Sequence, residues 1–207
     1  KLNKSNLSKV AESIDLGVYI WSITADDNYI YAGGSAGKIY KLNKSDLSKV
    51  AESVAYDGGI YSIASDNNYL YVGGYDNKVF KLNKSDLTKA TESIDLGDSI
   101  WSIASDNNYL YVGGHVGSNA EKVYKLNKSD LSKVAESVAY DGGIYSIASD
   151  NNYLYVGGND NKVIKLNKSD LSKVAESIDL GVYIWSITAD DNYIYAGGSA
   201  GKIYKLN

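Results

Sequence analysis

Residues 59–83 read GIYSIASDNNYLYVGGYDNKVFKLN and have the clearest structural pattern in the chain. Isoleucine, valine and tyrosine recur there in three short runs, which is typical of β-strands. The runs are separated by Asp-Asn-Asn at 66–68 and Tyr-Asp-Asn at 75–77, and aspartate and asparagine favour tight turns. The stretch therefore predicts three antiparallel strands joined by short turns, at 59–65, 69–73 and 78–83.

The segment 47–54 has two interpretations. Its apolar side chains are spaced as they would be on one face of a helix: Leu47, Val50, Ala51 and Val54. Such a helix has little more than two turns, and Ser48 occupies the capping-box position where Glu or Gln is preferred. We therefore predict a fourth strand at 47–54.

This pattern returns five times along the 207 residues. Each unit opens with KLNKS and has 40 residues, except the third, which has 44; the units are 1–40, 41–80, 81–124, 125–164 and 165–204. A repeat of this length is typical of solenoids and propellers, because one unit cannot bury both of its faces without a neighbour. The whole chain, 1–207, is predicted to be one domain.

The stretch YLYVGGYDNKVFKLNKSDLTKATES, residues 69–93, resembles the repeat of pyrroloquinoline-quinone-type (quinoprotein-like) β-propellers, and every unit contains its equivalent. The resemblance implies four-stranded up-and-down blades, with the 59–65 strand innermost and the 47–54 strand outermost. The tryptophan usual in the outermost strand of that family is replaced by residues such as Val50 and Ala51. Only the fold is taken from the resemblance, and no cofactor is expected.

The two ends of the chain predict how the ring closes. Residues 4–14 match the outermost strand of a blade, and residues 182–207 match the three strands that such a blade still needs. We expect the N-terminal strand to join these three and to close an all-β, five-bladed propeller within one chain, as a monomer without free sheet edges. Lys1–Asn3 duplicates Lys205–Asn207, so one triplet is surplus and is expected to fray. An open fragment that assembles between chains is the alternative.

Differences between the units are confined to two kinds of loop. The loops before each 59–65-type strand and the loops equivalent to 75–77 vary, whereas the turns equivalent to 66–68 and 43–45 hardly change. Alternate turns of an up-and-down blade lie on alternate faces, so one face varies and the other is uniform. We call them the variable face and the uniform face, and the variable face is the candidate binding face. Neutral drift at tolerant loop tips explains the same pattern.

Candidate ligand-binding residues lie on the variable face. An aromatic residue recurs near the start of each innermost strand, and the five are expected to form a ring: Trp21, Tyr61, Trp101, Tyr145 and Trp185. Tyr75 and His115 lie in the variable loops beside them. Flat side chains of this kind bind a carbohydrate or a peptide with little loss of entropy. Packing between blades is the other role for the ring.

The composition argues against catalysis. The chain has no Cys, no Arg and one His, so the usual nucleophile–base pairs and His-rich metal sites are not expected, and the carboxylates are mostly copies of one another. A net charge of −4 without a basic face argues against nucleic acid, and no apolar run is long enough for a membrane span.

Two functions remain. The first is a non-catalytic scaffold or binding module. The alternative is a structural propeller, engineered or recently amplified, with no specific ligand; it is supported by the first and last units, which differ only at Asn6 and Asp170.

Overall fold

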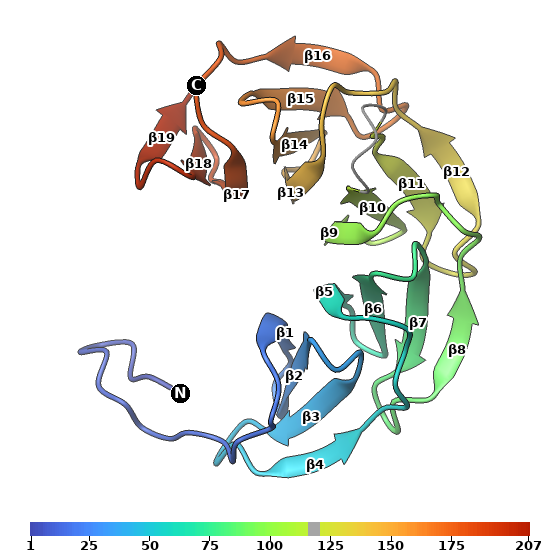
Figure 1. The fold of residues 1–207 in the computed structure, drawn as a ribbon, viewed down its shortest axis with the longest axis vertical. Coiled ribbons are helices and arrows are strands. Elements are labelled where there is room, and N and C mark those ends of the chain that lie inside the picture. The colour runs from blue at the N-terminus through green and yellow to red at the C-terminus, as the bar shows by residue number, and fades with distance from the viewer. Residues whose placement is uncertain (116–120) are drawn as a thin grey trace.

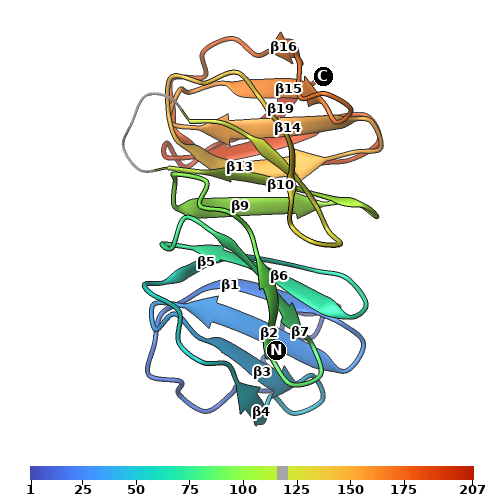
Figure 2. The ribbon, with the colours of Figure 1, turned by 90° about the vertical axis from the view of Figure 1, so that its right-hand side faces the viewer.

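The computed structural model describes residues 1–115 and 121–207, and its regular elements are all β-strands. They form five separate antiparallel sheets, each running from the inner rim to the outer rim, which we call blades 1 to 5 (Figure 1). The first three blades contain β1 (Ile20–Ala25), β2 (Tyr29–Gly34), β3 (Ile39–Asn43) and β4 (Lys49–Glu52); β5 (Ile60–Ser65), β6 (Tyr69–Gly74), β7 (Val79–Asn83) and β8 (Lys89–Glu92); and β9 (Ile100–Ser105), β10 (Tyr109–Gly114), β11 (Tyr124–Asn127) and β12 (Lys133–Glu136). The last two contain β13 (Ile144–Ser149), β14 (Tyr153–Gly158), β15 (Val163–Asn167) and β16 (Lys173–Glu176); and β17 (Ile184–Ala189), β18 (Ile194–Gly198) and β19 (Ile203–Leu206). Figure 2 shows blades 1 to 4 following one another in chain order, with blade 5 behind blade 4.

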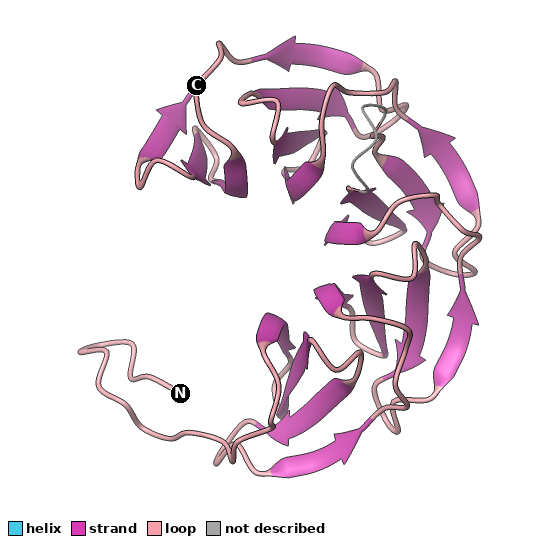
Figure 3. Ribbon diagram, viewed as in Figure 1, coloured by secondary structure: helices cyan, strands magenta, loops and turns pink. Residues whose placement is uncertain are grey.

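The predicted strands are confirmed in blade 2, where β5, β6 and β7 match the three predicted ranges to within one residue at each end. The segment 47–54 is a strand and not a helix, but it is shorter than predicted, since β4 covers Lys49–Glu52. Leu47 belongs to the preceding turn, where its φ is 64° and its amide donates to Asn43 O at 2.8 Å. Figure 3 shows the described chain as strands and connecting loops.

The hydrophobic core lies between blades. Tyr31 and Ile39 of blade 1 belong to one buried cluster with Ile60 and Ile63 of blade 2. The contact is so close that a Cβ on Gly33 would lie 2.7 Å from Ile60 Cγ2, so a larger residue at position 33 would displace the isoleucine. Equivalent clusters fill the next three junctions. Each junction is therefore the unit of packing, as expected for a repeat protein.

The predicted closure within one chain is wrong for this structure. Blade 5 has three strands, β17, β18 and β19, and the outer edge of β19 pairs with no strand of the described chain. Figure 1 shows the five blades as an open arc, with β1 and β17 on opposite sides of the opening.

The reason lies in the triplet that was expected to fray. Residues 1–3 fold back onto residues 8–11: Asn3 N donates to Ser8 O at 2.9 Å, and Val10 N donates to Lys1 O at 2.8 Å. Lys1–Asn3 thus takes the pairing that Lys205–Asn207 would need, and it does so with a short loop, which costs less entropy than joining the distant chain ends.

Candidate ligand-binding faces

The structure groups the loops on two faces as predicted. On the variable face, Tyr75 N donates to Gly59 O at 3.1 Å and His115 N donates to Ser99 O at 3.0 Å, which ties the two kinds of variable loop together. On the uniform face, Lys44 N donates to Asn28 O at 2.8 Å. Each face is therefore a continuous surface built from equivalent loops of successive blades.

The five predicted aromatic residues form a continuous band along the inner strands. Neighbouring ring centroids lie 5.1, 5.3, 5.2 and 4.6 Å apart, in the order Trp21, Tyr61, Trp101, Tyr145 and Trp185. Every one of them sits at a break in the pairing register of its strand, where a β-bulge adds an unpaired residue and redirects its side chain. The band therefore packs blade against blade, and it also lines the inner wall of the arc.

Exposure differs along this aromatic band. Trp21 and Trp185, at its two ends, are 50% and 48% exposed, whereas the three rings between them are half-buried. The rings of Tyr61, Trp101 and Tyr145 are partly covered by their neighbours. A ligand can therefore contact their edges and the hollows beside them.

One such hollow brings most of the candidate residues together. A cavity of about 460 Å³ on the variable face is lined by Tyr61, Tyr75, Asn77, Ser99, Trp101 and His115. The His115 ring meets Trp101 and Tyr145 edge-on, with centroids 6.3 and 5.8 Å apart. Tyr75 is 62% exposed at the rim. Among the described residues, no Asp, Glu or Lys lines this cavity, so it is mainly aromatic and neutral.

Blade 3 carries a carboxyl pair that the sequence analysis missed. Burial, together with a hydrogen bond to Glu121, raises the pKa of Asp98 well above its ordinary value. Glu121 is fully buried, and its Oε1 lies 3.3 Å from His115 Nδ1, so the one histidine of the chain has a carboxylate beside it. Most of the inserted loop, residues 116–120, lies outside the described residues. The sequence contained one sign of this carboxyl pair: Asp98 stands where the first and last units have valine.

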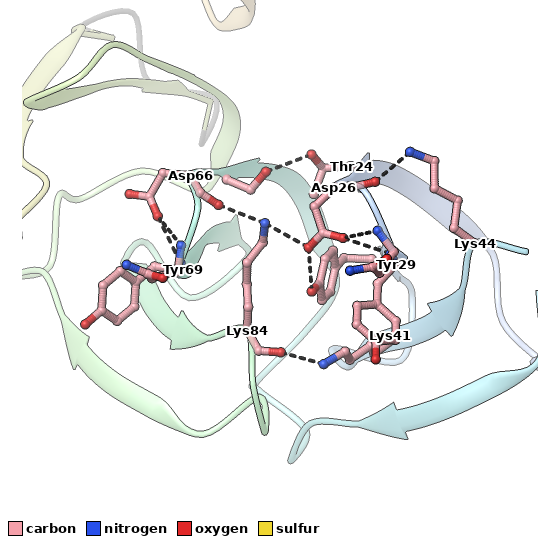
Figure 4. Close-up of polar contacts among 12 residues, drawn as sticks. Thr24, Asp26, Tyr29, Lys41, Lys44, Asp66, Tyr69 and Lys84 are labelled. Carbon is pink, nitrogen blue, oxygen red and sulfur yellow. Dashed lines mark hydrogen bonds and ion pairs between the residues drawn. The ribbon is translucent and has the colours of Figure 1, made fainter.

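A second and larger hollow lies on the uniform face, where no ligand was predicted. It has a volume of about 660 Å³ and is lined by turns of blades 1 and 2, including Asp26, Tyr29, Asp66 and Lys84. Figure 4 shows its polar network: Asp26 Oδ2 accepts from Tyr31 Oη at 3.0 Å and pairs with Lys84 Nζ of the next blade at 3.0 Å.

A buried lysine completes this network. Lys41 Nζ donates to Lys84 O at 2.7 Å and lies 4.1 Å from the centre of the Tyr29 ring. The cross-blade ion pair recurs as Lys128–Asp66 and Lys168–Asp106. Burial acts to raise the pKa of Asp26, but hydrogen bonds from the Tyr29 amide, Lys84 and other donors outweigh it and lower the pKa to about 2. These charged groups form ion pairs with one another across each junction, so we assign them a structural role in joining neighbouring blades.

Within residues 1–115 and 121–207, no group of three or more His, Cys, Asp or Glu side chains is arranged to hold a metal ion. The same residues contain no helix that is long and apolar enough to span a membrane.

Comparisons with known proteins show the fold. No family model and no curated protein matches the chain. A chain in the solved structure titled "Crystal Structure of Mitotic Checkpoint Complex" superposes with a TM-score of 0.79 at 14% sequence identity, over 89% of this chain. The matched region spans 63% of that chain. At this identity the likeness concerns architecture alone, and it agrees with the β-strand topology: the protein is a β-propeller of five repeated blades.

Proposed function

We propose that this protein is a non-catalytic propeller scaffold that binds carbohydrate on its variable face. The observation that carries the proposal is the cavity between blades 2 and 3, where the rings of Tyr61 and Trp101 meet the polar side chains of Asn77, Ser99 and His115. The quinoprotein-like resemblance adds nothing to this site, because only the fold was taken from it.

The chemistry of the cavity favours a neutral, hydroxylated ligand. Aromatic rings contact the flat C–H faces of a sugar, and a few polar groups fix its orientation. No lysine or carboxylate among the described residues lines the cavity, so the lining offers no ion pair to a charged peptide or a phosphate. An aromatic residue of the inner strand recurs in every blade, so further weak sites along the same band would reinforce the first through avidity.

The burial of Asp98 and Glu121 argues against catalysis by this carboxyl pair and so agrees with a binding role. Asp98 is 8% exposed and Glu121 is 0% exposed, so a substrate has little access to either. An acid–base pair must reach the reacting atoms to act on them.

Parallel glycan and peptide arrays, followed by calorimetry, test the proposal. We expect glycan binding that Trp101→Ala weakens by about tenfold, since a central aromatic contact contributes on the order of 1–2 kcal/mol. Asn67→Ala, on the exposed uniform face, is the matched control and should leave affinity unchanged. Trp101→Phe should retain part of the affinity if stacking is responsible.

Two outcomes would contradict the carbohydrate proposal. Binding to peptides alone would assign the cavity to another ligand class. No binding on either array by the folded protein would favour a structural propeller without a ligand.

A further inference from the structure

The two ends of the arc expose surfaces that every internal junction buries. On blade 1, Ile20 and Ile23 are 39% and 67% exposed. Their equivalents in blade 2, Ile60 and Ile63, are 2% and 8% exposed because blade 1 covers them. The first blade therefore presents an uncovered junction surface, which we call the leading surface.

Blade 5 presents the opposite half of the same junction, the trailing surface. Ile203 is 78% exposed, whereas its equivalent in blade 4, Val163, is 4% exposed. A Cβ on Gly197 would meet nothing within 4 Å, but one on the equivalent Gly157 would lie 2.6 Å from Ile184 Cγ2 of the next blade. The glycine leaves room for an isoleucine that no described residue supplies.

The two surfaces are complementary because they are the two sides of one repeated contact. At each internal junction, an isoleucine amide of one blade donates to a serine hydroxyl of the blade before it, as Ile63 N does to Ser22 Oγ at 3.0 Å. The contact recurs at the other three junctions. Ile23 in β1 and Ser186 in β17 occupy the corresponding positions at the two ends, and Figure 1 shows β1 and β17 on opposite sides of the opening.

The N-terminal segment already lies where a preceding blade would lie. Lys1 Nζ donates to Lys44 O at 3.4 Å and to Ser45 O at 3.1 Å. At the next junction, Lys41 Nζ makes the same contacts with Lys84 O and Ser85 O, at 2.7 and 3.2 Å. Residues 1–14 thus occupy the position of the outer edge of a blade, but no three-stranded sheet of the described chain lies beside them.

We infer that the occupant of this position is blade 5 of a second copy of the chain. The trailing surface of one copy packs on the leading surface of the other, and β19 pairs with residues 4–14 as its fourth strand. The equivalent pair Tyr40–Glu52 predicts that Tyr204 of one copy lies opposite Glu12 of the other. Lys205 then replaces Lys1 at the Lys44 and Ser45 carbonyls. The contact is head-to-tail, so it builds a ring or an open row of copies.

The first experiment measures mass by size-exclusion chromatography with light scattering across a concentration series. We expect concentration-dependent multiples of the 22.4 kDa chain. Ile23→Asp blocks one end and Ile203→Asp blocks the other, so each variant alone should be monomeric and their equimolar mixture should form dimers through the one intact contact. Val138→Asp changes a similarly exposed aliphatic residue away from both ends and should associate as the unchanged chain does. A monomer at every concentration, or association that both end variants leave intact, would overturn the inference.

The second experiment distinguishes a second copy from closure within one chain. The chain has no cysteine, so Glu12→Cys combined with Tyr204→Cys introduces one defined pair. Oxidation should give covalent dimers and larger species on a non-reducing gel. An internal disulfide in a monomer would show that the chain closes on itself and would refute the exchange between copies.

Discussion

The interior junctions and the ends of the arc have nearly the same sequence but different surroundings. Ile63 is 8% exposed and Ile23, its equivalent in blade 1, is 67% exposed. Both lie in six-residue inner strands of similar sequence, IYSIAS and IWSITA, which share isoleucine at the first and fourth positions and serine at the third. The comparison teaches that burial in this protein is supplied by the neighbouring blade and not by the blade itself, so stability resides mainly in the junctions.

The largest expected difference between the two regions comes from truncating these isoleucines. Ile63→Ala should reduce the free energy of unfolding by about 2–5 kcal/mol, because it leaves a cavity in a packed cluster. Ile23→Ala should cost less than about 0.5 kcal/mol, since the side chain is already largely solvated. Urea unfolding at low protein concentration, where copies do not associate, measures both. Equal losses would show that blade 1 is covered in solution.

A smaller difference is expected for the glycines that face each junction. A Cβ on Gly73 would lie 2.3 Å from Ile100 Cγ2 and 2.7 Å from its Cβ, so Gly73→Ala should destabilise the fold by about 1–3 kcal/mol through overpacking. Gly197→Ala meets open space and is expected to be neutral or slightly stabilising, since alanine reduces the entropy of the unfolded chain. Thermal unfolding of the two variants provides the comparison, and a marked loss for Gly197→Ala would contradict an open trailing surface.

The smallest effect concerns the ion pair across the junction of blades 1 and 2. The pKa of Asp26 is about 2 in the folded protein, below its ordinary value of 3.8, so the carboxylate stabilises the fold above pH 3.8 and this contribution is lost as the pH falls through 2. Lys84→Met should raise the pKa of Asp26 and cost about 1 kcal/mol at neutral pH. The difference in unfolding free energy between the two proteins should shrink between pH 4 and pH 2. A difference that does not change with pH would show that Lys84 acts through packing alone.

The candidate site was predicted in part. The aromatic residues at one position of every unit were visible in the sequence, and the band they form follows from the repeat. The network on the uniform face was not foreseen, because Asp26 and Lys84 are far apart in sequence and meet only when two blades pack. The Asp98–Glu121 pair was also missed, since it depends on a loop that occurs in one unit only.

The strands, their turns and the number of blades follow from the sequence alone, because alternating apolar residues and Asn- or Gly-rich turns act over a few residues and are repeated five times. The burial of the turn at Leu47 and its equivalents was decided by tertiary structure: Leu87 and Leu131 are 2% and 1% exposed, but Leu7 has the same positive φ while 71% exposed, so the conformation belongs to the turn and only its burial depends on the neighbouring blade. The opening of the arc was decided in the same way. Closure depends on how far each blade rotates relative to the next and on whether Lys205–Asn207 reaches the N-terminal segment to replace the local pairing of Lys1–Asn3, and both depend on the whole arc.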